Sequence, residues 1–346
     1  MRSAGVKTYV YHWTRALRRL AGEAVSLFPF VPFVEDCPLD RSVLPRLATW
    51  SRLALLHLAN GSPLPILNAL GSRVGVFHAS HQLVRPPRNT RLTATLYDMT
   101  CWLVPEMHAP ANVAAAKRFA REVLTRADGL IAISEHTRAD AVRILDLDPD
   151  RVTVIYPGVS EDYFDARPAA RGKPYALFVG TIEPRKNVAT LLDAWEQLPP
   201  GVRAEFDLVV AGPAGWGDPS VLARLASSAC YLGYVPERDL PGLVAGAAVF
   251  VYPSLYEGFG LPIAQAMAAR VPVIASNVSS MPEVAGAGGL LVDPRSAADL
   301  SLALARLLIS PSLRSSLGSE GRARAERYRW SECARASWRF FQQVAE

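Results

Sequence analysis

An acidic, glycine-rich turn in the second half of the chain has the residue types of an anion site. The hexapeptide EGFGLP, residues 257–262, follows an apolar run at residues 247–252 and precedes an alanine-rich stretch. Gly258 and Gly260 allow the backbone to come close to a ligand, and Pro262 is typical of the first helical position. Since the first N–H groups of a helix lack intrahelical partners, the turn predicts a phosphate site at a helix N-terminus.

Two polar side chains stand on either side of this turn in the sequence. Glu257 opens it and Gln265 lies about one helical turn into the stretch that follows, so both could flank a bound anion. The alternative is an ordinary strand-to-helix loop whose glutamate is solvated.

A second turn carries two adjacent cations. The apolar run YALFVGT, residues 175–181, predicts a strand, and EPRKN at residues 183–187 follows it, with Asn187 as a helix N-cap. Parallel sheets bind ligands at the carboxyl ends of their strands, where Arg185 and Lys186 would lie. Arginine forms paired hydrogen bonds and lysine acts as a point charge, so the two could hold a diphosphate. A solvated pair in an exposed loop is the alternative.

The elements around these turns alternate between strands and helices, which predicts an α/β protein with a mostly parallel sheet in each half. We expect one domain over residues 1–160, a second over residues 161–327, and a C-terminal amphipathic helix over residues 328–346. The expected strands are 25–30, 74–78, 92–97, 129–133 and 152–156 in the first half, and 175–180, 206–211, 231–235, 247–252, 271–275 and 289–292 in the second.

These segments resemble a known family, the retaining, nucleotide-sugar-dependent glycosyltransferases of group 1. In that family's GT-B architecture, two Rossmann-like domains with parallel sheets face each other across a cleft. The resemblance rests on GVKTYV, YDMTCWLVPE, ADGLIAISEHT, RVTVIYPGV, FVGTIEPRKN, LVVAGP, YLGYVPERDLPGL and the block from VYPSLYEGFGLP to GGLLVDP. It also implies that the C-terminal helix packs back toward the first domain.

The resemblance implies roles for the residues of both turns. The catalytic residues would be Glu257, which would contact the donor sugar, and Arg185 with Lys186, which would bind the diphosphate. No metal would be required, because the cations and the helix dipole would stabilise the leaving group. The distal phosphate would meet the backbone of Gly258, Phe259, Gly260 and Leu261.

Three positions depart from the family pattern. Gln265 stands where a second glutamate usually holds the ribose, although an amide still donates and accepts hydrogen bonds. Thr181 stands where many members have arginine, and Arg185 supplies the missing charge. The GVKTYV loop, in which Gly5 would approach the leaving phosphate, begins without the strand that normally precedes it. We therefore expect the first strand of the first domain to be missing, with the true start upstream, or else a compromised domain.

The acceptor would lie mostly on the first domain. Tyr97 and Asp98 end an expected strand where many relatives have His-Asp, so by analogy they face the cleft. Tyrosine does not serve as a base near neutral pH, because its pKa is about 10. His78, at another strand end, is a candidate substrate contact, and a structural role is the favoured alternative.

Charge is unevenly spread over the 346 residues, whose formal net charge is +5. The first 126 residues hold 16 Lys and Arg against 7 Asp and Glu, which indicates attraction to an anionic acceptor or membrane surface. No nucleic-acid motif accompanies this charge, and no apolar run is long enough to span a membrane. Cys37, Cys101, Cys230 and Cys333 lack metal-ligand spacing and are interpreted as buried or half-buried thiols in a reducing cytoplasm.

Together these features predict a retaining hexosyltransferase of the cytoplasm or of the inner face of the plasma membrane. It would move a hexose, with GDP-mannose as the favoured donor, to a glycan or lipid-linked acceptor in polysaccharide or lipopolysaccharide synthesis. The expected partners are the nucleotide sugar, this acceptor and an anionic membrane, without nucleic acid, metal or another cofactor. The alternatives are a catalytically impaired subunit that binds nucleotide sugars or glycans, and a nucleotide-sugar epimerase.

Overall fold

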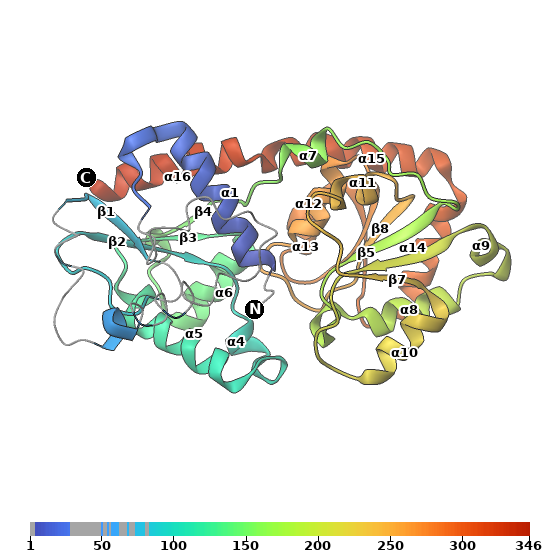
Figure 1. The fold of residues 1–346 in the computed structure, drawn as a ribbon, viewed down its shortest axis with the longest axis horizontal. Coiled ribbons are helices and arrows are strands. Elements are labelled where there is room, and N and C mark those ends of the chain that lie inside the picture. The colour runs from blue at the N-terminus through green and yellow to red at the C-terminus, as the bar shows by residue number, and fades with distance from the viewer. Residues whose placement is uncertain are drawn as a thin grey trace. The chain divides into compact units, whose positions relative to one another are not determined.

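The chain forms two compact α/β units. The structure, a computed structural model, describes residues 4–27, 50, 54, 57–61, 68, 73–79 and 83–346. One unit is formed by Met1–Gly158 with Trp330–Glu346, and the other by Val159–Arg329. Each unit holds one sheet, and all the described strand pairs are parallel (Figure 1). No helix in the described residues is long and apolar enough to cross a bilayer.

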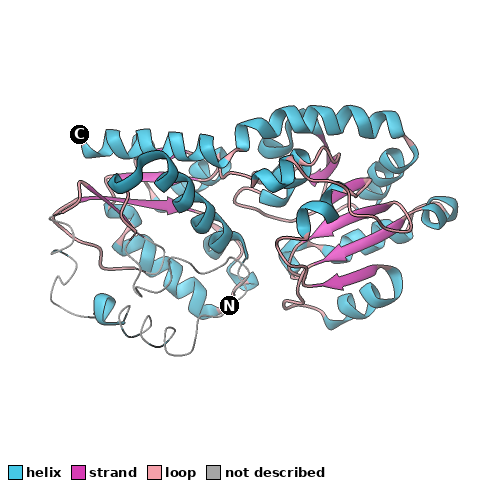
Figure 2. Ribbon diagram, turned by 45° about the horizontal axis from the view of Figure 1, so that its top comes forward, coloured by secondary structure: helices cyan, strands magenta, loops and turns pink. Residues whose placement is uncertain are grey.

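The first unit has a four-stranded sheet in the order β1-β2-β3-β4. Its strands are Val76–Ala79 (β1), Arg91–Leu96 (β2), Gly129–Ala132 (β3) and Val152–Val154 (β4). Its helices include Ala4–Ala21 (α1), Thr100–Leu103 (α4), Pro110–Glu122 (α5), Glu135–Leu145 (α6) and Trp330–Ala345 (α16). Helices α1 and α16 lie side by side on one face of this sheet, with α5 on the other (Figures 1 and 2).

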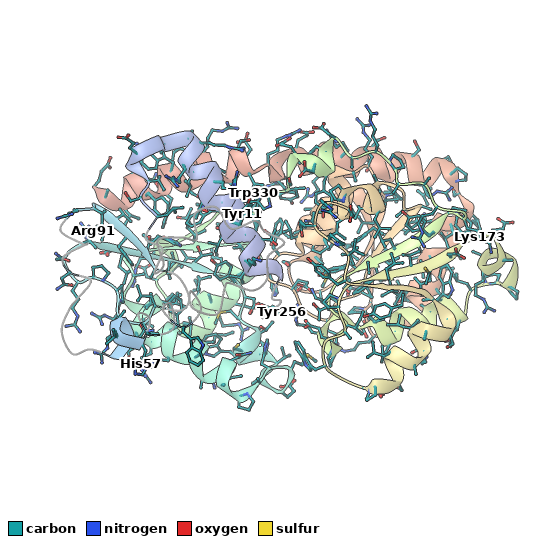
Figure 3. All side chains as sticks on the ribbon, in the orientation of Figure 1. Tyr11, His57, Arg91, Lys173, Tyr256 and Trp330 are labelled. Carbon is teal, nitrogen blue, oxygen red and sulfur yellow. The ribbon has the colours of Figure 1, made fainter. Side chains whose placement is uncertain are left out.

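Amphipathic patterns account for the packing of α1 on α16. Tyr9, Trp13 and Leu17 recur every four residues on α1, and all three are buried. Trp13 Nε1 donates a hydrogen bond of 2.9 Å to Ser337 Oγ on α16. The ring of Trp330, at the start of α16, lies 5.7 Å from that of Tyr9 (Figure 3). The C-terminal helix is therefore packed within the first unit.

The second unit has a six-stranded sheet in the order β10-β9-β8-β5-β6-β7. Its strands are Tyr175–Val179 (β5), Asp207–Ala211 (β6), Cys230–Gly233 (β7), Val249–Tyr252 (β8), Val273–Ser276 (β9) and Gly289–Val292 (β10). Its helices are Glu161–Phe164 (α7), Val188–Glu196 (α8), Pro200–Glu205 (α9), Pro219–Ser228 (α10), Leu240–Ala245 (α11), Leu261–Ala268 (α12), Met281–Ala285 (α13), Ala297–Ile309 (α14) and Pro311–Ala325 (α15). Helix α8 packs with α10 and α14, helix α12 packs with α11, α13 and α15, and the sheet lies between the two groups (Figure 2). Strands β8 and β9 are buried along their whole length, because helices cover both faces of the sheet.

Most expected strands form close to their predicted ends, but the start of the first unit differs from expectation. Residues 25–27 are not in a strand, and residues 28–30 lie outside the described ones. The expectation of a loop at GVKTYV is wrong, because these residues form the first turns of the helix that buries Tyr9 and Trp13. Gly5 is exposed in that helix. A strand upstream of Gly5 stays a prediction.

Candidate active site

Three connections converge at the carboxyl edge of the second sheet, after β5, β8 and β9. Leu255 N, in the turn after β8, donates a hydrogen bond of 2.8 Å to Arg185 O in the turn after β5. Glu257 N donates to Ser279 Oγ at 3.0 Å, and Ser280 Oγ donates to Glu257 O at 2.8 Å. The turn that carries Glu257 is thus fastened to both of its neighbours.

Side chains from two of these turns form a buried ion cluster. Glu257 Oε1 lies 2.7 Å from Lys186 Nζ and 2.9 Å from Arg185 Nη1. Burial by itself would raise the pKa of Glu257, but the charges of Arg185 and Lys186 outweigh it and lower the pKa to about 2. Glu257, only 8% exposed, is therefore an ionised carboxylate at neutral pH. The structure brings together the three residues that the sequence proposed as catalytic.

Two members of the cluster were missed by sequence reasoning. Glu183 Oε1 accepts a hydrogen bond of 2.8 Å from Arg185 Nη2. Tyr252 Oη accepts one of 2.5 Å from Lys186 Nζ, which also lies 4.9 Å from the centre of the tyrosine ring. With Glu183 included, two carboxylates balance two cations, so the cluster is formally neutral. The EPRKN turn contains Glu183, but only the fold shows that its side chain faces Arg185.

Both cations keep hydrogen-bond donors for a further ligand. Within the described part of the chain, Lys186 Nζ donates to two partners, and an ammonium has three N–H groups. Arg185 contacts Glu183, Glu257 and, at 2.7 Å, the carbonyl oxygen of Tyr256, which Figure 3 labels. A guanidinium has five N–H groups, so two remain in addition to these contacts. The cluster can therefore hold phosphate oxygens without losing its internal bonds.

Asn187 joins the cation turn to two other connections. It lies at the N-cap position of α8 with a left-handed backbone, φ 58°, and its side chain forms no capping hydrogen bond. The predicted N-cap position is therefore confirmed, although the side chain does not accept a bond from the helix backbone. Its Nδ2 instead donates to Pro253 O at 3.0 Å and to Pro294 O at 2.6 Å, because the left-handed backbone directs the amide toward the strand ends. Asn187 thus fixes the position of the two preceding cations.

The N-terminus of α12 presents fewer donors than the sequence suggested. Gly260 is its N-cap, with φ 91°, a conformation that favours glycine. Pro262 has no N–H, and Ile263 N donates to Gly260 O at 2.9 Å. Among the first three helical residues, the described structure leaves the N–H of Leu261 without a partner. The predicted contact of a phosphate with the backbone of residues 258–261 stays a prediction, and the N–H of Leu261 is the donor that this helix start offers it.

The remaining predicted donor residues surround this turn. Gly258 and Phe259 are buried within it, and Gln265 is half-buried one helical turn into α12. Thr181 follows β5 and packs against the connection after β6, where a Cβ added to Gly215 would lie 2.7 Å from Thr181 Cγ2. Their roles toward a donor stay predictions.

His78 is a structural link in the first unit. Its Nδ1 lies 3.0 Å from Thr93 Oγ1 and its Nε2 lies 3.1 Å from Thr95 Oγ1, so it joins β1 to β2. The rings of Trp13 and Phe341 lie 4.9 and 5.6 Å from the imidazole. Burial lowers the pKa of His78 to about 3, and the imidazole is neutral at physiological pH.

Tyr97 and Asp98 also lie in the first unit, at the end of β2. The ring of Tyr97 meets that of Tyr9 edge-on at 5.4 Å, and burial raises the pKa of its phenol well above the usual value. Asp98 Oδ1 accepts hydrogen bonds from Thr100 N at 3.0 Å and Thr100 Oγ1 at 2.6 Å. Asp98 therefore stabilises the start of α4, and Tyr97 presents a neutral phenol.

The cysteines agree with expectation in part. Cys333 is buried and Cys101 half-buried, but Cys230 is exposed because it begins β7, a strand at the edge of its sheet. Cys37 lies outside the described residues. In the ranges that the structure describes, no group of three or more His, Cys, Asp and Glu could hold a metal ion.

Two family models match the chain, one over each unit. The model "Glycosyl transferases group 1" matches residues 159–324, and "Glycosyltransferase Family 4" matches residues 3–163. The first match contains the whole ion cluster.

Curated relatives resemble most of the chain. O-antigen chain mannosyltransferase B of Escherichia coli is 37% identical over 264 residues, 72% of this chain and 69% of the relative. D-inositol 3-phosphate glycosyltransferase of Streptomyces bingchenggensis is 33% identical over 276 residues, 68% of this chain and 61% of the relative. The chain thus spans somewhat more than three fifths of these two proteins.

Solved structures resemble the fold at low identity. WaaG, a glycosyltransferase involved in lipopolysaccharide biosynthesis, matches with a TM-score of 0.67 at 16% identity, covering 97% of this chain and 96% of its own. HepE of Anabaena, in complex with UDP-glucose, matches with a TM-score of 0.67 at 18% identity. The match covers 83% of this chain and 84% of the HepE chain.

Proposed function

Since the chain belongs to the group 1 glycosyltransferases and has their GT-B fold, we propose that it is a retaining hexosyltransferase of cell-surface polysaccharide synthesis. It is a glycosyltransferase, as the sequence predicted. The retaining mechanism, the hexose and the pathway are the proposed part. The observation that carries the proposal is the cluster of Arg185, Lys186 and Glu257 beside the N-terminus of α12.

The donor is a nucleoside diphosphate sugar whose diphosphate lies on this cluster. The unused N–H groups of Arg185 and Lys186 donate to phosphate oxygens, and the N–H of Leu261 adds a backbone donor at the positive end of α12. The complexes of HepE with UDP-glucose and with UDP support such a donor for this fold.

Transfer proceeds by substitution on one face of the sugar. The bond between the anomeric carbon and the diphosphate oxygen breaks, a leaving-group oxygen takes the proton of the acceptor hydroxyl, and the new glycosidic bond forms on the same face. Arg185 and Lys186 stabilise the negative charge that grows on the leaving group. Glu257 orients a donor hydroxyl and stabilises the oxocarbenium-like sugar. We assign it no nucleophilic role, because its pairing with two cations lowers the pKa of the carboxylate and with it its nucleophilicity.

The transferred sugar is a hexose, with mannose from GDP-mannose as the favoured case. The name of the Escherichia coli relative, O-antigen chain mannosyltransferase B, supports mannose and a cell-surface glycan. The acceptor is a glycan or a lipid-linked glycan.

A panel of nucleotide sugars tests the donor. A ligand at 100 times its dissociation constant stabilises a protein by about 2.7 kcal/mol, so the correct donor raises the melting temperature more than the others. Transfer to a lipid-linked mannan acceptor is then measured with that donor, and the anomeric configuration of the product is read by NMR. An inverted product contradicts the retaining mechanism, and nucleotide binding without transfer favours a non-catalytic subunit.

The first unit also offers a basic surface for an anionic membrane. Arg15, Arg18 and Arg19 are exposed on α1, opposite its buried aromatic residues, and the side chain of Leu20 is 46% exposed beside them. Cations at a membrane surface contribute about 1 kcal/mol each, so peripheral binding at the inner face is part of the proposal. Sedimentation with vesicles containing phosphatidylglycerol tests it. Equal binding to vesicles of phosphatidylcholine alone contradicts it.

A further inference from the structure

A half-exposed tryptophan stands on a tightly packed loop beside the ion cluster. The loop of residues 212–217 follows β6, and Trp216 lies between two glycines in it. Its side chain is 54% exposed, although tryptophan has one of the largest apolar surfaces of any residue. Gly212 and Gly217 have φ 141° and 129°, so the backbone around Trp216 needs glycine.

This loop is fastened to the segment that leads into the two cations. Ile182 N donates to Pro213 O at 3.0 Å, and Gly215 N donates to Ile182 O at 3.1 Å. A Cβ added to Gly215 would lie 2.7 Å from Ile182 O, and one added to Gly217 would lie 3.1 Å from Pro184 Cδ. Pro184 immediately precedes Arg185 in the chain. The backbone that carries the exposed indole is therefore fixed against the segment that leads into the two cations.

The order of the strands shows on which side of the cluster Trp216 lies. The cations follow β5 and Glu257 follows β8, whereas β6 and β7 lie on the other side of β5. Tyr234 follows β7 at the same carboxyl edge and is 52% exposed. Suppose that a diphosphate lies on the cluster and its nucleoside extends over β6 and β7. The nucleoside would then reach the exposed side chains of Trp216 and Tyr234.

We propose that Trp216 stacks on the base of the donor nucleotide and that Tyr234 borders the same surface. The inference rests on the proposed function, because the cluster must hold the diphosphate for the base to reach Trp216. Every nucleobase presents a flat π-face, so the indole adds affinity for the nucleoside without selecting one base. Polar groups that hydrogen-bond to the base would distinguish one base from another, and the tryptophan would contribute affinity for any nucleoside.

The test compares ligands with and without a base. GDP, UDP and inorganic pyrophosphate are titrated into the wild-type chain and into Trp216→Ala, Trp216→Phe and Leu222→Ala. Leu222, 37% exposed on the following helix α10, is the control for loss of an exposed apolar side chain. We expect Trp216→Ala to weaken binding of the preferred nucleoside diphosphate about 5- to 100-fold, the range of base–aromatic stacking. Pyrophosphate binding and the melting temperature stay unchanged, and Trp216→Phe retains most of the affinity.

Other outcomes overturn the inference in distinguishable ways. An equal loss for pyrophosphate means that Trp216 only supports the cation turn. A loss that occurs with the nucleotide sugar but not with the nucleoside diphosphate places the indole on the sugar. Unchanged affinity for GDP and UDP removes Trp216 from the site while leaving the proposed function intact. A wild-type chain that binds no nucleoside diphosphate refutes the proposed function and this inference together.

Discussion

Titratable side chains near the carboxyl edges of the two sheets differ in their ionisation state. In the second unit, Glu257 accepts contacts from Lys186 and Arg185 inside the protein, and all three are charged at neutral pH. In the first unit, His78 and Tyr97 are neutral, and each lies beside an aromatic ring of α1.

Elementary electrostatics accounts for the difference. Buried charges persist only when they are paired and hydrogen-bonded, as in the ion cluster. An imidazole taken out of water beside aromatic rings, with hydroxyl partners alone, prefers its neutral form. The two units therefore keep these titratable side chains in different forms, as paired ions in the second unit and as neutral groups in the first. Under the proposed function, the two cations of the second unit would stabilise an ionic leaving group.

The largest effect is expected from Glu257→Ala. The change removes the proposed contact with the donor sugar and leaves Arg185 and Lys186 with Glu183 as the one carboxylate of the cluster. We expect transfer to fall about 10²- to 10³-fold or more, with nucleotide binding still measurable. Initial rates and calorimetric titration measure the two quantities, and a melting curve confirms that the variant is folded. Full activity in this variant would refute the role of Glu257.

Acid stability should depend on the same carboxylate. The pKa of Glu257 is lowered from 4.5 to about 2, so its ionised form stabilises the fold above pH 4.5, and this contribution is lost as the pH falls toward 2. A shift of this size corresponds to about 3 kcal/mol of unfolding free energy. Urea unfolding of the wild type and Glu257→Gln between pH 6 and pH 2 measures it. The two curves should converge at low pH, and parallel curves would contradict the pairing.

Arg185→Ala should weaken nucleotide affinity, and it should also lower stability because Glu183 loses its partner and Glu257 keeps Lys186 alone. Charge-assisted hydrogen bonds contribute about 1.5–3 kcal/mol each, so we expect binding of the nucleoside diphosphate to fall about 10- to 100-fold. Arg224→Ala is a matched control, since Arg224 pairs with Asp193 and Glu196 on the surface of the same unit. Unchanged affinity in Arg185→Ala would exclude a diphosphate on the cluster.

The smallest effect on transfer is expected in the first unit, where His78 is a structural residue. The pKa of His78 is lowered from 6.5 to about 3, so the unfolded chain binds a proton that the folded chain does not as the pH falls below 6.5. The stability that this lowered pKa confers at neutral pH is lost between pH 6.5 and 3. His78→Asn should remove that dependence while the pH profile of transfer between pH 6 and 8 keeps its shape. If the pH profile of transfer lost its acid limb in this variant, His78 would have a proton-transfer role. The first unit would then no longer be the one whose titratable side chains stay neutral.

Some site residues could be found from the sequence because they lie within one short turn. EGFGLP and EPRKN each combine a strand end, a helix start and charged residues within a few positions, and the alternation of elements places both at the carboxyl edge of one sheet. The pairing of Glu257 with Arg185 and Lys186 then follows from β5 and β8 being neighbours.

Other features depend on side-chain direction and could not be read from the sequence. The hydrogen bond from Lys186 to Tyr252 joins residues 66 positions apart. Asn187 is the N-cap of α8, as predicted, but the sequence did not show that its amide donates to Pro253 O and Pro294 O. Gly5 lies within the helix Ala4–Ala21, because the packing of Tyr9 and Trp13 outweighs the low helix propensity of glycine.

The fold class, the parallel sheets and the two turns that carry the cluster could be predicted from the amino-acid sequence, because hydrophobic periodicity and turn chemistry are local. The charge balance of the site, the neutrality of His78 and the exposed position of Trp216 depend on the folded structure. Each of these depends on the burial of a side chain and on the groups from distant parts of the chain that contact it. The burial and these contacts are set only when the strands have paired.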